Sequence, residues 1–567
     1  MSDTGSKTSK SFVKEAAILS LSGFAVKFIG LVYKIPLTTI LDESMGVFTA
    51  AYSIYAMLFM ISTSGLPVAI SRMIAGSAEK GRLIETKKIL KMSVFMFSVV
   101  GIVCSLLLFF GAETIAVWSV HPDSVLAMKV ISPTLLFICI ASAYRGYFQG
   151  LRNMNPTAIS QFIEAFLKLI IGLGATLIAR KMGYSLVVQA ACAISGVTFG
   201  TFLGMLYLIL YHKRKKNNCI VNKTRATMRY RQIAARMFAI SLPVTITSSC
   251  LYLSNFLDTL VINKALIGSG IAEQTAEALY TSYVALTIPI SDLLPSTLVY
   301  PIAISILPAV AGALALKKRK KAIGYIVSSI RISGIIALPS AFCLCALSRP
   351  AIALIYSSGW GKEIVLAGGK TVMPIDVASK ALSILAIGIF FISLVSTTNA
   401  LLQAVGRMYD PMKSVLAGVM ILILLEVTLV SIKPIGIYGA PISSVACYVT
   451  ALYMNMRYLR KCQNIKLPFR RLFLKPLVCS AICGVFCFIS YKIGFALWQG
   501  NPDGRFASFV ILIITGVLAV FLYVFLMLLV KGITANEVRL LPKGKQLCAY
   551  FVRKGWLSDS GVDLEDE

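Results

Sequence analysis

Long apolar stretches recur along this chain and constrain its fold more than any other feature. About fourteen segments are predominantly hydrophobic over roughly 20 residues or more, the length that an α-helix needs to cross the hydrocarbon core of a bilayer. Charged residues make up only 14% of the chain, against about 25% in soluble domains. The sequence therefore predicts an all-α polytopic membrane protein with about 14 transmembrane helices. The predicted spans lie near 15–34, 47–71, 89–111, 126–148, 156–179, 185–211, 234–262, 279–308, 322–347, 376–404, 412–431, 436–458, 472–494 and 507–530.

Basic residues gather in the loops that follow even-numbered spans, and the formal net charge is +31. Loops retained in the cytoplasm are enriched in Lys and Arg, so we interpret this excess as a signal of membrane topology. Binding of anionic lipid headgroups is an additional role, and no nucleic-acid partner is expected. Both termini are predicted to be cytoplasmic, with a disordered N-terminus over 1–12 and a tail over 532–567. Arg180 and Lys181, on an outer turn, are the exception. The basic clusters lie within 80–91, 213–231, 317–321 and 457–471.

Two short motifs occur twice, at equivalent spans. Pro67–Ser71 resembles Pro301–Ser305, and Gln149–Arg152 resembles Gln403–Arg407 in position and in the Met and Pro that follow. Six spans per repeat place both repeats in the same orientation, with a substrate cavity expected between the halves. The predicted organisation is two six-helix lobes and a terminal pair of helices. Its parts are an N-lobe at 13–212, a basic linker at 213–232, a C-lobe at 233–460 and the terminal pair at 470–531.

Enzyme motifs are missing from the sequence. Gly76–Gly81 is followed by Arg82 and Leu83, which departs from the phosphate-binding loop that ends in Lys and Ser or Thr, and there is no GxSxG or HExxH segment. We therefore expect a transporter without a cofactor or an ATP site. An ion gradient, the membrane potential or the substrate gradient would drive it.

Four cations near or within spans are the candidate substrate-binding residues. Lys27 and Lys34 share one helical face of the first span, Arg72 ends the second span, and Arg145 lies near the end of the fourth. Charges within a membrane are costly and usually face the protein interior or a water-filled cavity. These cations are expected to attract an anionic substrate such as a diphosphate. The alternatives are snorkelling of Lys34 to the interface and binding of lipid headgroups by Arg145.

The charged residues that lie deep within the spans of the second half are mainly acidic. Asn255 and Asp258 are three residues apart in the seventh span, and Glu426 lies deep in the eleventh. Because carboxylates bind Na⁺ or a proton, these three residues are the candidates for cation coupling. Asp258 is the candidate Na⁺ ligand. Structural pairing of the carboxylates with Arg331 or Lys264 is the alternative.

Two further groups of residues are predicted to be structural. Glu164 and Lys168 have the i, i+4 spacing of an ion pair on one helix. Cys479, Cys483 and Cys487 follow helical spacing in an apolar span and are expected to pack as small apolar residues.

Several segments resemble one transporter family. Gly30–Pro36, Gly65–Arg72, Tyr144–Gly150 and Asn399–Gly406 are similar to the polysaccharide-biosynthesis branch of the multidrug/oligosaccharidyl-lipid/polysaccharide (MOP) exporter superfamily. That branch includes stage V sporulation protein B-like proteins and MurJ-type lipid II flippases. The resemblance implies a cavity that alternates between the two faces of a bacterial cytoplasmic membrane. It also implies cavity cations for a diphosphate, a groove near the last two helices for a lipid tail, and a cation site in the second half.

The resemblance implies a flippase for an undecaprenyl-diphosphate-linked sugar, with lipid II as the favoured cargo. Its partners would be this lipid-linked oligosaccharide, membrane lipids and cell-wall synthesis proteins. Three other hypotheses remain open at this stage. They are a flippase for another lipid-linked polysaccharide (teichoic, capsular or spore-specific), a cation-coupled multidrug exporter, and a non-transporting cell-wall scaffold.

Overall fold

The protein was analysed as a computed structural model. It describes residues 21–30, 32–33, 36–37, 40–41, 45–63, 65–79, 82–118, 122–151, 153–216, 228–315, 319–355, 364–365, 371–463, 469–497 and 505–532. Within these residues the chain forms two compact units, one ending at Leu253 and the other beginning at Ser254. Lys34 and Arg152 lie outside the described residues.

The described residues of the first unit form helices around a central one, α5. Helices α2, α3, α4 and α8 all pack directly against α5, which is buried over most of its length. Its elements are a helix at Leu21–Gly30, α2 (Met45–Thr63), α3 (Leu66–Glu79), α4 (Leu83–Trp118), η2 (Pro122–Ser124), α5 (Val125–Gly150), α6 (Asn155–Leu167), the π-helical turn η3 (Lys168–Gly172), α7 (Leu173–Lys181), α8 (Leu186–Lys216) and the first part of α9 (Tyr230–Gly268).

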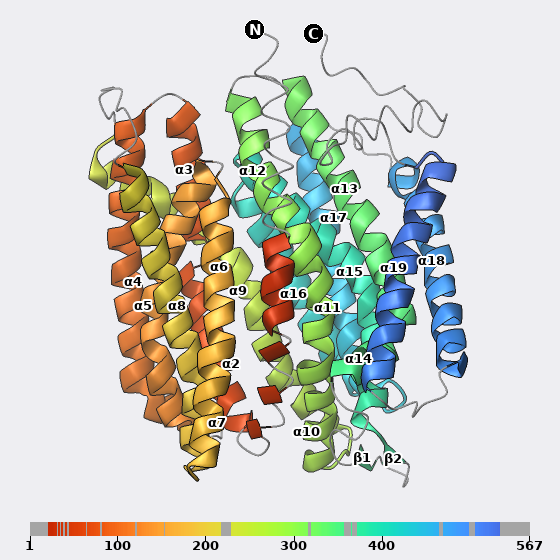
Figure 1. Ribbon diagram of the computed structural model, residues 1–567. Coiled ribbons are helices and arrows are strands. Elements are labelled where there is room, and N and C mark those ends of the chain that lie inside the picture. Colours follow the sequence, from red (N-terminus) through yellow and green to blue (C-terminus); the bar gives the residue numbers. More distant parts are fainter. Residues whose placement is uncertain are drawn as a thin grey trace. The chain divides into compact units, whose positions relative to one another are not determined.

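The second unit repeats this plan around α15, against which α12, α13, α14 and α17 pack. Helices of each unit run side by side, and the two short strands lie beside α10 (Figure 1). The elements are the remainder of α9, α10 (Glu273–Thr281), η4 (Ser282–Thr287), α11 (Ile288–Leu294), η5 (Pro295–Val299), α12 (Tyr300–Ala315), α13 (Arg319–Ala346), α14 (Ser348–Ile355), β1 (Ile364–Val365), β2 (Thr371–Val372), α15 (Pro374–Val405), α16 (Tyr409–Val430), η6 (Gly436–Tyr438), α17 (Gly439–Gln463), α18 (Phe469–Leu497) and α19 (Arg505–Leu529).

Eleven helices of the described part are long and apolar enough to cross a membrane. Large apolar side chains on their outer faces are exposed, including Phe110, Met420 and Phe521, each at least 70% accessible. Water would not tolerate a continuous surface of this kind, whereas lipid covers it. The prediction of an all-α polytopic membrane protein is confirmed. The described residues contain 11 such helices, against the 14 predicted.

The second predicted span, 47–71, is interrupted. Helix α2 ends at Thr63 and α3 begins at Leu66. A Cβ atom on Gly65 would lie 2.2 Å from the backbone oxygen of Ser241, so only glycine permits this close contact between the break and α9. Pro67, in the first turn of α3, has no N–H to continue a helix from α2. The break therefore follows from the Gly-Leu-Pro sequence, which hydrophobicity alone does not reveal.

The prolines of the eighth predicted span, 279–308, predict a kinked or broken helix, and the structure shows an irregular segment there. It is divided into α10, α11 and α12 by two π-helical turns, and the second turn begins at Pro295. Pro289 follows directly on the first π-helical turn, and its missing N–H removes one backbone hydrogen bond from this continuous helical segment. Pro243, in contrast, is accommodated within the continuous helix α9.

The first half of α9 packs in the core of the first unit. Ile233 and Met237 are fully buried in a cluster with residues of α3, α4 and α5, and Ser93 of α4 contacts the Met237 sulfur at 3.6 Å. The two compact units divide at Leu253/Ser254, within α9.

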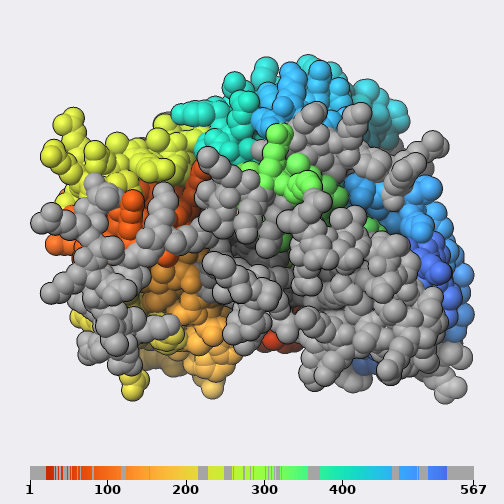
Figure 2. All heavy atoms as spheres, turned by 90° about the horizontal axis from the view of Figure 1, so that it is seen from above, coloured from red at the N-terminus to blue at the C-terminus, as the bar shows by residue number. Residues whose placement is uncertain are grey.

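The terminal helices α18 and α19 pack on the second unit through α13 and α14, and they lie at its rim in the view along the helices (Figure 2). Cys479 and Cys483 are buried with Tyr523 and Met527 of α19. Cys487 is also fully buried, with its sulfur 3.5 Å from that of Cys343 on α13. The packing role predicted for the cysteines of α18 is confirmed.

Candidate functional site

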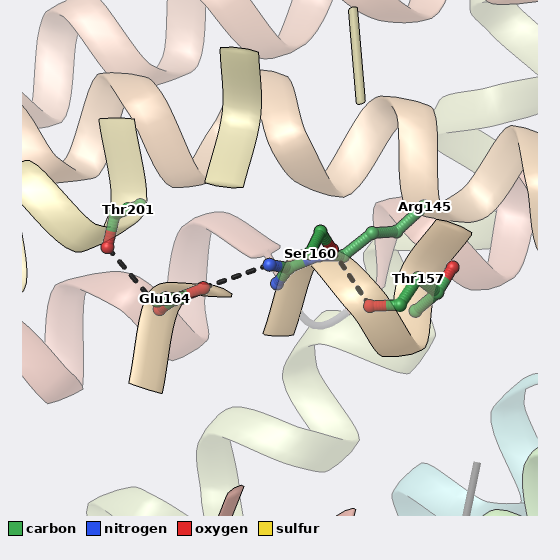
Figure 3. A network of polar contacts seen from close by, with 5 residues as sticks. All are labelled: Arg145, Thr157, Ser160, Glu164 and Thr201. Atoms are coloured by element: carbon green, nitrogen blue, oxygen red, sulfur yellow. Dashed lines mark hydrogen bonds and ion pairs between the residues drawn. The ribbon is translucent and has the colours of Figure 1, made fainter. Parts of the chain in front are cut away.

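A partly buried polar network lies inside the first unit, where α5, α6 and α8 meet (Figure 3). Arg145 of α5 forms an ion pair with Glu164 of α6, with 2.9 Å between Nη2 and Oε2. Arg145 also donates from Nε to Ser160 Oγ at 3.1 Å, and Thr201 of α8 donates to the second Glu164 oxygen at 3.3 Å. Both oxygens of Glu164 are thus engaged, and the charge of Arg145 is balanced within the network.

Glycines of α8 allow α6 to approach closely enough to build this network. Gly196, Gly200 and Gly204 follow one another at four-residue spacing, which places them on one helical face. A Cβ atom on Gly196 would lie 2.5 Å from the backbone nitrogen of Gly172, and one on Gly200 would lie 2.6 Å from the backbone oxygen of Glu164. Small residues of this kind permit close helix packing in membranes.

Lys168 contacts aromatic rings instead of Glu164, so the predicted i, i+4 pair is wrong. Its Nζ lies 5.0 Å from the ring centroid of Tyr33 and 4.9 Å from that of Tyr52. Lys168 begins the π-helical turn η3, which alters the α-helical register expected from i, i+4 spacing. Each cation–π contact contributes about 0.5–2 kcal/mol, depending on desolvation.

The two rings that hold Lys168 are themselves fixed. The Tyr33 hydroxyl donates to the backbone oxygen of Ala193 on α8 at 3.0 Å. Tyr52 stacks on Phe48, with ring centroids 5.9 Å apart, and approaches Tyr55 at 5.8 Å. The site around Lys168 of η3 therefore combines Tyr33, Tyr52 of α2 and, through the Tyr33 hydroxyl, α8. The position of Lys168 near the middle of the 27-residue span Asn155–Lys181 could have identified this site from the sequence. The i, i+4 spacing from Glu164 suggested a structural ion pair instead.

The candidate cations of the first unit do not form a single cluster in the described residues. Lys27 lies on the helix Leu21–Gly30 with an exposed side chain. Arg72 is half-buried on α3 and lies near Arg236 of α9, so two positive charges occur together at that end of the unit. Arg145 is neutralised by Glu164. Lys34 is outside the described residues.

In the second unit two predicted acidic residues come together. Asp258 of α9 is 2% exposed, Glu426 of α16 is 0% exposed, and the two carboxyl groups are close enough to influence each other electrostatically. Oδ1 of Asp258 and both carboxyl oxygens of Glu426 lack hydrogen-bond partners among the described residues. Two buried carboxylates side by side repel each other when both are ionised. A bound cation or proton would relieve that repulsion.

Polar side chains of η4 and α17 lie near the acidic pair. Tyr283 of η4 is near both carboxyl groups, and its hydroxyl lies 3.3 Å from Ser444 Oγ of α17. Asn255 is on the same helix as Asp258, one turn away, and its side chain is outside the described set. Within the residues described, groups of three or more Cys, His, Asp or Glu arranged to hold a metal are not found. The pair supplies two ligand groups, which suits a proton or, with further neutral oxygens, Na⁺.

Arg331 serves the terminal helices. Its Nη2 donates to the backbone oxygen of Gly532 at 2.8 Å, just beyond the end of α19, where Lys475 of α18 also donates to Val530 and Lys531 oxygens. The last carbonyl groups of α19 accept from the backbone amides of Val530, Lys531 and Gly532, and the two cations bind the carbonyls of these three residues. The Tyr523 hydroxyl adds a bond to the Ile335 oxygen of α13 at 2.8 Å. Arg331 thus helps to hold the segment that follows α19.

Known proteins resemble this chain over nearly its whole length. It is 26% identical to the uncharacterized membrane protein YabM over 95% of this chain and 96% of that protein. It is 24% identical to the lipid II flippase MurJ over 91% and 95%, and 25% identical to stage V sporulation protein B over 94% and 98%. All three are from Bacillus subtilis (strain 168).

Solved structures show the same fold. An outward-facing multidrug resistance MATE family transporter of the MOP superfamily matches with a TM-score of 0.63 at 14% identity, over 80% of this chain and 96% of that one. The eukaryotic MATE transporter AtDTX14 matches with a TM-score of 0.64 at 14% identity, over 83% and 99%. A family model described as polysaccharide biosynthesis protein matches residues 12–313, more than half of the sequence. The chain therefore belongs to the polysaccharide biosynthesis protein family, within the MOP exporter superfamily of membrane transporters.

Proposed function

We propose that this protein is a flippase that moves an undecaprenyl-diphosphate-linked sugar across the bacterial cytoplasmic membrane by alternating access, with lipid II as the favoured cargo. The relatives support a lipid-linked polysaccharide as the substrate class, because one full-length relative is named a lipid II flippase and the family is named for polysaccharide biosynthesis. The observation that carries the proposal is the separation of two charged sites within the spans. The first unit holds a half-buried lysine at mid-span, and the second holds two neighbouring buried carboxylates.

This separation assigns a role to each unit. A cation within the first unit offsets the hydration that a diphosphate loses when it leaves water. The acidic pair of the second unit takes up a coupling cation, with Asp258, Glu426 and Asn255 as its ligands, so that translocation is tied to a Na⁺ or proton gradient. Sugar and diphosphate would cross within the protein while the lipid tail stays in the bilayer. With both termini cytoplasmic, the substrate would enter from the side where it is made.

Flipping by purified protein in liposomes tests the proposal. Undecaprenyl-linked sugars of peptidoglycan, teichoic and capsular type are compared, each with and without a Na⁺ or proton gradient. We expect transport of the peptidoglycan precursor to be fastest and to respond to one of the two gradients. Efflux of cationic dyes without lipid flipping would instead indicate a multidrug exporter, and the absence of all transport would favour a scaffold.

The acidic pair has its own test in the same assay. Asp258→Asn and Glu426→Gln are expected to abolish the response to the ion gradient while flipping down the substrate gradient persists. Asp376→Asn is the matched control, because Asp376 is a half-exposed carboxylate that pairs with Arg349 at 3.2 Å. Gradient-driven transport by both site variants at the wild-type rate would refute the coupling role.

A further inference from the structure

We infer that Lys168 is an anion-binding residue of the first unit. Its ammonium group moves away from the rings of Tyr33 and Tyr52 and binds the diphosphate of the transported lipid. The inference rests on the proposed function and adds a residue to it. The juxtaposition that carries it is one ammonium group held at mid-span between two aromatic faces, 5.0 Å and 4.9 Å from their centroids.

The position of Lys168 argues for a functional charge. A lysine near the middle of a 27-residue span is too far from either end of the span to snorkel readily to water. Ionisable residues at that depth are expensive unless they are paired or used. Its helical neighbour Glu164 is committed to Arg145 and Thr201, so the carboxylate one turn away does not neutralise it.

The contacts of Lys168 suit an exchange of partners. Rings of Tyr33 and Tyr52 offer the ammonium an attractive face but no hydrogen-bond acceptor, so its three N–H donors gain no acceptor from them. A phosphate oxygen supplies both opposite charge and acceptors. Since the rings are fixed by the Ala193 hydrogen bond and by stacking on Phe48, the flexible lysine chain is the part that moves.

The local backbone also favours a functional reading. Lys168 begins a single π-helical turn within an otherwise α-helical span, and such turns occur frequently at functional sites. The turn is packed against α8 through Gly172 and Gly196, which fixes the backbone beneath the mobile side chain.

Binding measurements with purified protein in nanodiscs separate this role from a structural one. The probes are undecaprenyl diphosphate, undecaprenol, which lacks the diphosphate, and phosphatidylglycerol. For Lys168→Gln we expect affinity for undecaprenyl diphosphate to fall about tenfold or more, with undecaprenol binding unchanged. Lys168→Arg should keep most of the affinity. Lys129→Gln is the matched control, because Lys129 of the same unit forms an exposed pair with Glu113 at 2.9 Å.

The outcomes distinguish this inference from the proposed function. Wild-type protein that binds undecaprenol as well as undecaprenyl diphosphate would refute the proposed function. A wild-type preference for the diphosphate that persists in Lys168→Gln would refute only the role of Lys168, and so would an equal loss for undecaprenol or phosphatidylglycerol. If Lys168→Gln does not fold, Lys168→Met carries the same test, because it removes the charge and keeps an apolar chain suited to the interior.

Discussion

The ion pair between Arg145 and Glu164 is expected to stabilise the first unit only as a pair. Arg145→Met leaves a carboxylate without its cation, and Glu164→Leu leaves a guanidinium without its anion. Each single change should lower the free energy of unfolding by roughly 1–3 kcal/mol. The double variant should lose less than the sum, because no lone charge remains. Thermal unfolding in detergent, followed by circular dichroism, measures the cycle, and strictly additive losses would contradict the pairing.

For individual side chains, the sequence showed which residues are polar and deep in the spans, but it did not show which of them meet. Asp258 and Glu426 were predicted as cation candidates, and the fold brings them together. Arg145 was predicted to face a substrate, yet it is held by Glu164, a residue that the i, i+4 spacing assigned to Lys168. Spacing along one helix reports local geometry, whereas partners on other helices depend on packing and on the π-helical turn, which sequence periodicity does not encode.

At the scale of elements, the glycine face of α8 should be sensitive to a single methyl group. Gly200→Ala places a Cβ atom where the backbone oxygen of Glu164 lies 2.6 Å away, so α6 and α8 must separate. The expected cost is about 1–3 kcal/mol. Gly174→Ala on α7 is the control, because a Cβ atom there meets nothing within 4 Å and alanine favours helix. Equal thermal midpoints for the two variants would show that the contact between α6 and α8 is loose.

The attachment of α19 gives a second prediction for elements. Arg331→Met removes the donor to the Gly532 carbonyl, so the turn Val530–Gly532, whose amides bond the last carbonyls of α19, should fray. Hydrogen–deuterium exchange of the amides in that turn should accelerate about tenfold, which corresponds to about 1.4 kcal/mol. Arg331→Lys, which retains a cationic donor, should show a smaller increase. Unchanged exchange in the methionine variant would mean that Lys475 alone is sufficient to cap the helix.

Helices as elements were largely predictable, and their interruptions were less so. Apolar length located nearly every span, because twenty residues of lipid-compatible sequence have few other uses. The prolines of the eighth span correctly indicated an irregular segment. The break at Gly65 was missed because hydrophobicity does not register the Gly-Leu-Pro sequence or the close approach of Ser241 that requires glycine there.

For the whole molecule, the distribution of basic loops predicts the orientation in the membrane. Lys and Arg cluster after even-numbered spans, and cytoplasmic loops carry this bias. A green fluorescent protein fused after Glu567 should fluoresce, since it folds in the cytoplasm, and alkaline phosphatase fused at the same point should be inactive. Alkaline phosphatase inserted at Gly183, in the turn between α7 and α8, should be active although Arg180 and Lys181 precede it. If the number of helices before that turn differed by one, the phosphatase inserted at Gly183 would be inactive. If the number after the turn differed by one, only the results of the fusions after Glu567 would be inverted. The two fusion sites together therefore test the predicted even number of spans, which the 11 long helices of the described residues do not decide.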